Sequence, residues 1–310
     1  MAGSVDNGLI SFYTTQFSTR LELLLQQRGS KLRGKVAEGF HMGKMASPIN
    51  QVGTISMKAP VGRFSPKSME VAALTRPWIF PIGGEVDQLI DTFDELQTAV
   101  EVKSGYVEAA AAAAGRYWDD GLIVAATGTT QRGQDASALT GETFNTTNFQ
   151  IASTFGAAAA AGLTVAKLIE AKRILRHYHN DLESDPPTLV IGSQQEADLL
   201  NQVQFVSTEF NDKPVLVDGQ VKRFLGFDIV NSERLQQTTV GSVRGVLAFV
   251  KSGLYLGIWK EATTQIFQRP ELSGNPWDIS TTMMYGACRT QLGKVIQILC
   301  ADTTGSDITP

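Results

Sequence analysis

The sequence predicts an α+β fold, and three observations support this expectation. An alanine-rich stretch ending near Ala126 favours one long helix. The last third of the chain, from Phe224 onward, consists mainly of short β-branched and aromatic runs of the kind found in strands. No internal repeat and no regular alternation of strands with helices is visible, which argues against a doubly wound α/β fold.

The long helix is predicted to begin at Thr98, which has the capping-box spacing to Glu101, or at Ser104. From Ser104 to Ala126 it would be about 35 Å long at 1.5 Å per residue. The six alanines at 109–114 favour helix and allow another element to approach closely. We therefore expect a central spine on which sheets are laid.

The remaining elements follow in order along the chain. The polar stretch Thr127–Phe149 is expected to be a loop, and a second helix is predicted over Thr164–Tyr178. A short buried strand at Thr188–Ile191 leads into a helix at Ser193–Asn201. Further strands are predicted at Phe224–Val230, Arg244–Lys251, Leu254–Trp259, Thr263–Gln268, Thr281–Arg289 and Lys294–Ala301.

Two segments precede the long helix, and a compact monomer could not easily bury either. From Asn7 to Val36, apolar residues recur every three to five positions, which suggests an amphipathic helix that then turns basic. The first 45 residues contain six basic and three acidic residues, so their charge is +3, whereas the whole chain carries −4. The apolar positions are Phe12, Phe17, Leu21, Leu24 and Leu25.

The second segment, Glu38–Phe80, has two extended runs, Phe40–Ser47 and Ser68–Phe80, around a stretch rich in Pro and Gly. This composition argues against helix and predicts a long, open, hairpin-like loop. An ordinary edge hairpin with a mobile tip is the alternative. A loop of this length usually has a function or a partner.

Composition limits the class of protein. The chain is 43% hydrophobic and 19% charged, as in globular proteins, and no run approaches the roughly 20 apolar residues of a membrane span. The start lacks the basic and then apolar pattern of a secretory signal, so a cytoplasmic protein is expected. Cys288 and Cys300 have no metal-ligand spacing and are predicted to be reduced core residues. The sequence pI near 5.5 argues against general nucleic-acid affinity.

The sequence offers little evidence of catalysis. His177 and His179 close a basic helix without clustered Cys or carboxylate partners, so a solvated or capping role is favoured over a metal site. Asp119 and Asp120 point in different directions on a helix, and one of them is expected to pair with Arg116. The chain is therefore not expected to be an enzyme or to bind a cofactor or metal.

Ser193 follows a strand and opens a helix, as a catalytic serine in a nucleophile elbow does, but the second glycine of that motif is missing. The spacing of Ser193 to Glu196 instead predicts a helix N-cap with a capping box.

Six stretches, taken in order, resemble the major capsid proteins of tailed bacteriophages with the HK97-like fold, particularly those of short-tailed phages. Each stretch alone is weakly specific, but together they cover about 12–301 in the order found in the family. They are FYTTQFSTRLELLLQQRGSKLRGKV, SGYVEAAAAAAGRYWDDGLIVAA, KLIEAKRIL, PPTLVIGSQQEADLL, FLGFDIVNSERL and VLAFVKSGLYLGIWKEATTQIFQRPE.

The resemblance implies four parts. Residues 1–37 would be an N-terminal arm reaching under neighbouring subunits, and 38–80 an extended E-loop lying over the next subunit. A discontinuous peripheral (P) domain would combine 81–185 with 255–310 and contain the spine helix. Residues 186–254 would form the axial (A) domain at the capsomer centre.

The implied function is self-assembly into the icosahedral capsid of a virion of the Caudoviricetes, in which hexamers and pentamers enclose double-stranded DNA without sequence-specific binding. The implied partners are a scaffolding protein, a portal and a decoration protein, without any membrane, and assembly would take place in the host cytoplasm. Covalent cross-linking is not predicted. Candidate inter-subunit contacts are Arg28, Lys31, Arg33, Lys35, Lys44, Lys58, Arg63 and Lys67.

Other classes of protein remain open at this point. An encapsulin, which is a cellular nanocompartment protein of the same fold, would share most of these features. A soluble α+β hydrolase using Ser193 would need a converging histidine and acid. A phage accessory or tail protein would not normally carry both the spine helix and the loop.

Overall fold

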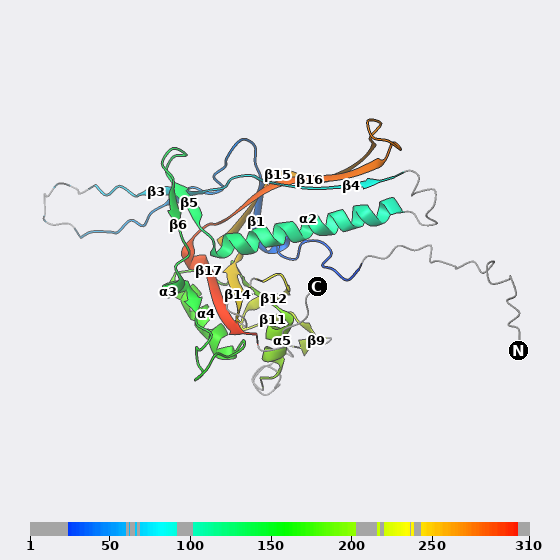
Figure 1. Cartoon of the computed structure of the whole chain (residues 1–310). Coiled ribbons are helices and arrows are strands. Elements are labelled where there is room, and N and C mark those ends of the chain that lie inside the picture. Colours follow the sequence, from blue (N-terminus) through cyan, green and yellow to red (C-terminus); the bar gives the residue numbers. More distant parts are fainter. Residues whose placement is uncertain are drawn as a thin grey trace, which may run out of the picture.

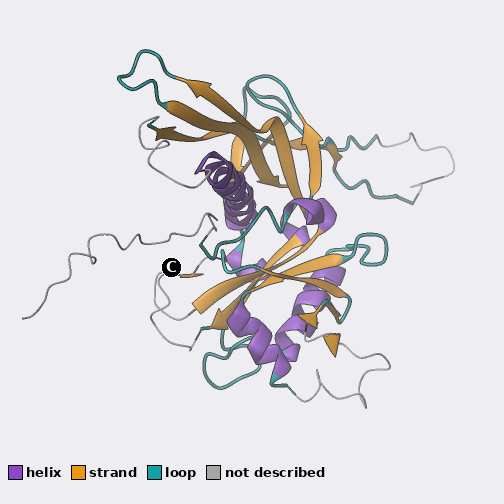
Figure 2. Cartoon of the chain, turned by 90° about the vertical axis from the view of Figure 1, so that its right-hand side faces the viewer, coloured by secondary structure: helices purple, strands orange, loops and turns teal. Residues whose placement is uncertain are grey.

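The computed structural model describes residues 24–59, 62, 66, 69–91, 102–202, 216–217, 220–235, 237–238 and 243–302. Within this part the chain forms two bodies, which Figure 2 shows one above the other with the long helix between them. In these residues no helix is long and apolar enough to cross a membrane. The predicted α+β class is confirmed.

The first body, which we call the spine body, is helix α2 (Val102–Thr127) packed on a four-stranded sheet. The strand order is β1 (Ala37–Phe40), β15 (Leu254–Gln268), β16 (Trp277–Arg289) and β4 (Ile82–Ile90). β1 runs parallel to β15, and the other pairs are antiparallel. Figure 1 shows α2 running along the length of this sheet. The 26 residues of α2 span about 39 Å at 1.5 Å each, so the predicted spine is confirmed.

Two glycines allow α2 and the sheet to approach closely. A Cβ on Gly121 of α2 would lie 2.2 Å from the Tyr285 hydroxyl, and one on Gly84 of β4 would lie 2.7 Å from the Tyr117 ring. The Tyr285 hydroxyl donates a hydrogen bond to the Tyr117 carbonyl at 2.8 Å, and the two rings meet edge to face. Position 121 therefore requires glycine, because the Tyr285 hydroxyl occupies the space that a Cβ atom would need.

The second body, the sheet body, contains a seven-stranded sheet in the order β11, β12, β8, β14, β17, β7, with β13 also paired to β14. Helices α4 (Val165–His177) and α5 (Ser193–Leu200) belong to this body. β8 is wholly buried, and β14 is buried from Gly245 onward, as expected for central strands. The strands are β11 (Arg223–Phe224), β12 (Phe227–Asn231), β8 (Pro187–Ile191), β14 (Val243–Val250), β17 (Val295–Ala301), β7 (Gln150–Ile151) and β13 (Gln237–Thr238).

A buried lysine fixes one edge of the sheet body. The Lys167 side chain is fully buried and donates hydrogen bonds to the carbonyls of Ala161, Gly162 and Leu299 at 2.7, 2.8 and 3.1 Å. Burial lowers the pKa of this ammonium. The three carbonyls join α4 to β17 and to the loop before α4.

A third sheet contains β2 (Gln51–Val52), β3 (Leu74–Trp78), β5 (Thr130–Gly133) and β6 (Thr140–Glu142), all antiparallel. The expectation that Thr127–Phe149 is a loop is therefore wrong. This stretch forms a β-hairpin and the short helix α3 (Thr146–Phe149), because β3 supplies a pairing partner that local composition does not reveal. A separate hairpin joins β9 (Leu216–Val217) and β10 (Gln220–Val221).

Several predicted boundaries change. The predicted strand Phe224–Val230 is split by a turn, in which Leu225 and Gly226 both have positive φ. The strands Leu254–Trp259 and Thr263–Gln268 are one strand, β15, with register shifts between Ile258 and Thr263. α2 is described from Val102, so the start at Ser104 is too late, while the start at Thr98 lies outside the described residues.

The predicted cap of α5 is also corrected. Gly192, not Ser193, is the N-cap residue, and the Gln195 side chain accepts a hydrogen bond from the Gly192 N–H at 3.1 Å. The Ser193 N–H is instead bound by Glu233, a residue distant in sequence. The second predicted helix, Thr164–Tyr178, is confirmed as α4, of which Thr164 is the N-cap residue and Tyr178 the C-cap residue.

We expect Gly121→Ala to destabilise the protein. Overpacking costs about 1–3 kcal/mol, and the contact with the buried Tyr285 places this site at the upper end. Alanine recovers only roughly 1 kcal/mol of helix propensity. Thermal unfolding should show a lower Tm, whereas Gly83→Ala, where an added Cβ meets nothing within 4 Å, should leave it unchanged. Equal Tm values for the two variants would contradict this account.

The two thiols should be unreactive in the folded chain. Burial raises the pKa of both Cys288 and Cys300 to about 12. Since an exposed thiol ionises near 9, the unfolded chain loses these protons first, and the stability that the thiols contribute should fall as pH rises from 9 toward 12. A thiol reagent at pH 8 should label neither cysteine until denaturant is added. Rapid labelling of the folded protein would contradict this expectation.

Candidate assembly site

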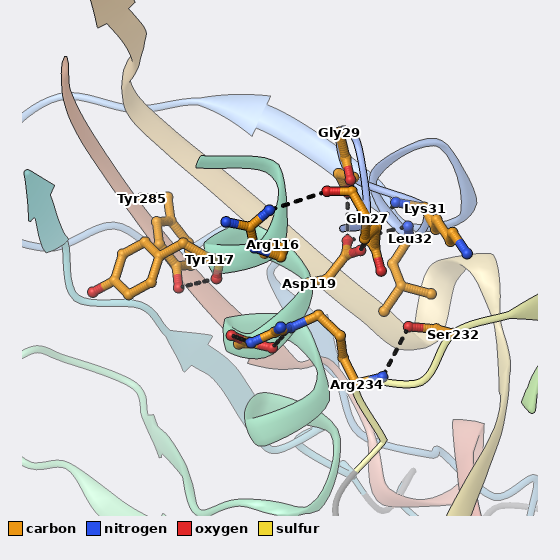
Figure 3. A network of polar contacts seen from close by, with 12 residues as sticks. Gln27, Gly29, Lys31, Leu32, Arg116, Tyr117, Asp119, Ser232, Arg234 and Tyr285 are labelled. Carbon is orange, nitrogen blue, oxygen red and sulfur yellow. Dashed lines mark hydrogen bonds and ion pairs between the residues drawn. The ribbon is translucent and has the colours of Figure 1, made fainter. Parts of the chain in front are cut away.

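The arm is bound to the spine helix through one carboxylate, that of Asp119. This side chain is fully buried and accepts four hydrogen bonds from arm residues (Figure 3). The donors are the Gln27 side chain at 2.5 Å, the Ser30 hydroxyl at 2.5 Å, and the backbone N–H groups of Lys31 at 3.0 Å and Leu32 at 3.2 Å. A buried carboxylate needs such partners because an unpaired one is costly.

The expected pairing of Arg116 with Asp119 or Asp120 is wrong. Arg116 instead donates hydrogen bonds to the Gln26 side chain at 2.7 Å and the Gln27 carbonyl at 3.2 Å. Asp120 pairs with Arg234 in a two-pronged contact with both distances at 2.5 Å. Partners distant in sequence therefore replace the local pairs that helix spacing suggested.

Glycines also allow the arm to approach α2 closely. Gly29 has φ +73°, and a Cβ on Gly115 of α2 would lie 2.4 Å from the Gly29 carbonyl carbon. The arm therefore crosses α2 where the helix has no side chain.

The helix predicted in the arm does not form in its described part. Residues 24–32 are irregular, followed by the short 3-10 helix η2 (Arg33–Lys35). The backbone N–H groups of Lys31 and Leu32 bind Asp119. Leu24 and Leu25 are exposed, while Leu32 and Val36 are buried in the main core. Phe12, Phe17 and Leu21 lie outside the described residues.

Three of the basic candidates contact their own chain. Lys31 donates a hydrogen bond to the Asn231 carbonyl at 2.8 Å, and Lys35 lies 3.4 Å from Asp228. Arg33 binds Glu38 and Glu261 at 3.0 and 2.5 Å. Its guanidinium also lies over the Trp118 ring.

The pKa of Arg33 is raised, chiefly by the hydrogen bond to Glu261. Partial burial opposes this shift, and the hydrogen bond to Glu38 adds to it. Arg33 therefore joins the arm to β1 and β15 of the spine body as a fixed cation.

The other candidates are placed differently. Arg28 and Lys44 are exposed and form no ion pair with a described residue. Lys58 lies 3.7 Å from Glu70 across the E-loop. Arg63 and Lys67 lie outside the described residues.

The base of the E-loop is held by a polar cluster that the sequence analysis missed. Arg132 of β5 donates hydrogen bonds to Gln51 at 2.9 Å, to Glu142 at 2.8 Å and to the Thr290 carbonyl. Gln51 donates a further one to the same carbonyl at 3.1 Å. No sequence signal joins these positions, which lie on β2, β5, β6 and the end of β16.

The neighbouring Arg289 is fully buried and ties the same region to the end of the spine helix. It donates hydrogen bonds to the carbonyls of Ala126, Gly128 and Glu142 at 2.9, 3.0 and 3.2 Å. A cation at these last carbonyls also suits the negative end of the helix dipole. Burial lowers the pKa of this arginine.

Beyond its base, the E-loop exposes large apolar side chains. Met57 and Met69 are essentially fully exposed, at 105% and 95%. Such a group on an extended loop, unlike scattered apolar residues, indicates an interaction surface. The exposed residues are Val52, Ile55, Met57, Met69, Val71 and Leu74, with Phe40 and Met42 at the start of the loop.

The residues considered for catalysis are not brought together. Ser193 contacts Glu233, which pairs with Arg244, and His177 lies at the end of α4. Among the described residues no group of three His, Cys, Asp or Glu side chains could hold a metal ion.

A spine helix on a long sheet, an extended loop with a fixed base and an arm bound across the helix define a shell-forming structural protein of the HK97-like fold. Residues 9–302 match the family model described as phage capsid protein. The chain therefore belongs to the phage capsid protein family. It is a major capsid protein that forms the phage shell as part of a multi-subunit assembly, and its location is the virion capsid.

Solved structures share this fold at low identity. The capsid of cyanophage P-SCSP1u aligns with a TM-score of 0.70 and 14% identity over 98% of this chain and 97% of that one. The capsid of cyanophage Pam1 gives 0.73 and 11% over 97% and 100%. A chain of Mycobacterium phage Che8 gives 0.69 and 16% over 98% and 100%. No curated protein matches significantly.

Asp119→Asn should loosen the arm. The amide keeps one acceptor oxygen and adds donors that face the arm's N–H groups, so at least two hydrogen bonds to a charged group are lost. We expect a loss of about 2–4 kcal/mol of stability. Hydrogen exchange of the Lys31 and Leu32 amides should accelerate. Glu108→Gln, the same change at an exposed position of α2, should alter neither property; equal protection in both variants would argue against the arm contact.

Proposed function

We propose that copies of this chain assemble through the E-loop and the arm into an icosahedral shell of hexamers and pentamers around double-stranded DNA. The observation that carries this proposal is the group of exposed apolar side chains on the E-loop, whose base is fixed by Arg132 and Gln51. A loop that is anchored and apolar is pre-organised for binding another surface, since little order is lost on contact.

Exposed methionines suit an interface that repeats with small variations. Met42, Met57 and Met69 are unbranched and flexible, so they can adapt to slightly different neighbours. Hexamers and pentamers would present such differences to one chain. Each contact is weak, but repetition around a closed shell makes the assembly stable.

We propose the four-part division 1–37 (arm), 38–80 (E-loop), 81–185 with 255–310 (P domain) and 186–254 (A domain). The proposed A domain supplies β8, β12 and β14 to the sheet body, while β7 and β17 come from the proposed P domain. The two domains would thus share one sheet.

The role is structural, with no catalysis and no cofactor, and this is preferred over the encapsulin and hydrolase alternatives. A scaffolding protein, a portal and a decoration protein are the proposed partners, with assembly in the host cytoplasm, and the phage would be short-tailed. Arg28, Lys44, Lys58, Arg63 and Lys67 remain proposed inter-subunit contacts, together with the arm residues Lys31, Arg33 and Lys35. The net charge of −4 suits a shell protein that encloses DNA without binding it tightly.

The proposal is tested by asking whether a variant that lacks part of the exposed apolar surface of the E-loop still assembles into shells. Met57→Ser with Val71→Ser should leave the fold intact, because both side chains are exposed, but should abolish closed shells in negative-stain images. Asn50→Ala with Thr54→Ala changes two exposed polar residues of the same loop and should still yield shells. Each chain would be expressed with its candidate scaffolding protein. Normal shells from the serine variant would refute the proposed contact.

A further inference from the structure

Within the described residues, the chain passes between the two bodies at one corner. β14 continues into β15 through η3 (Lys251–Gly253), and β16 continues into β17 through η4 (Leu292–Lys294). Thr290 binds the Gly253 carbonyl at 2.9 Å through its N–H and the Ser252 carbonyl at 2.7 Å through its hydroxyl, so these two crossings lie side by side.

The third described crossing, from α2 through the β5–β6 hairpin to α3, meets the same corner. Arg289 binds the carbonyls of Ala126, Gly128 and Glu142 at its start and middle. All three crossings therefore converge around Arg289 and Thr290. A corner of this kind has the geometry of a hinge.

Away from this corner the two bodies share one buried apolar core, and polar contacts join them at β12. β12 is two strands from β14 in the sheet, about 10 Å at the usual strand spacing of roughly 5 Å. Lys31 and Lys35 of the arm contact Asn231 and Asp228 at the two ends of this strand. Just beyond β12, Arg234 pairs with Asp120 of α2. Figure 3 shows Lys31 and Arg234 beside α2 at the place where the arm crosses it.

These contacts differ in strength from those that bind the arm to the spine body. The Asp119 carboxylate is fully buried, whereas the ionic side chains of the Lys35–Asp228 and Arg234–Asp120 pairs are 32–40% exposed. Exposed pairs contribute little individually and weaken in salt. The polar attachment of the arm to α2 is therefore buried, whereas its polar contacts with β12 are partly exposed.

We propose that Lys31, Lys35 and Arg234 form a latch that sets the angle between the spine body and the sheet body. When the latch opens, the sheet body turns about the corner at Arg289 and Thr290 while the arm stays bound to Asp119. The latch belongs to the single chain and does not depend on the proposed mode of shell assembly. Its weakness allows a neighbouring copy to shift the angle at small cost.

The test is the distance between two spin labels, one on each body. Ser273→Cys lies at the exposed turn between β15 and β16, and Glu183→Cys in the exposed loop after α4. The labelled chain would be diluted into excess unlabelled chain, so that distances within one chain dominate whether or not shells form. The two native cysteines are buried, and the native chain taken through the same labelling is the blank.

The latch variant K31Q/K35Q/R234Q should show a broader distance distribution with a shifted mean. The control variant R176Q/K222Q/K260Q removes the same charge from exposed residues that form no ion pair with a described residue and are not among the proposed inter-subunit contacts. Its distance distribution should match that of the chain with the native latch. Hydrogen exchange of the Lys31 and Leu32 amides should stay slow in the latch variant, because Asp119 still holds them.

A second measurement leaves the latch sequence unchanged, in case the triple variant fails to fold. At 1 M salt the screening length falls to about 3 Å, so the distribution for the unmodified latch should broaden in the same direction. Identical distance distributions for the latch variant and the control variant would overturn the proposal. If the latch variant cannot be purified, a distance distribution that does not change at 1 M salt would overturn it. The buried core shared by the bodies would then fix their angle alone.

Discussion

The buried carboxylate of Asp119 is the constraint on which the arrangement of the arm depends. Four donors from 27–32 meet its two oxygens, and this fixes where the arm crosses α2. The side chains of Leu32 and Val36 then enter the core, and Arg33 reaches Glu261 on β15. Since a buried charge must be satisfied, the arm cannot leave this position without exposing or neutralising the carboxylate.

Glycine and tyrosine determine how closely the elements pack around α2. Gly115 admits the arm backbone on one side, and Gly121 admits the Tyr285 hydroxyl on another. Each glycine costs helix propensity, roughly 1 kcal/mol relative to alanine. The alanine-rich sequence of the helix offsets this cost, so α2 can be both long and closely approached.

The E-loop combines a fixed base with an exposed apolar surface, and this combination fits the proposed contact with a neighbouring copy. Arg132, Gln51 and Thr290 hold the base through side-chain and backbone hydrogen bonds. Beyond them, the loop keeps Met57 and Val71 in water. In a member of the phage capsid protein family, burial of this surface against a neighbouring subunit is the contact that we propose.

The sequence by itself determined the α+β class, the spine helix, helix α4, the buried cysteines and the family. These depend on composition and on periodicity within one segment, or on motif order. Only the tertiary structure decided the partners of Asp119, the hairpin within Thr127–Phe149, the cluster around Arg132 and the placement of Lys31 and Lys35 on β12. Each of these depends on contacts between residues distant in sequence, such as Asp119 with Leu32, Arg132 with Thr290 and Lys31 with Asn231, and local propensity contains no information about such contacts.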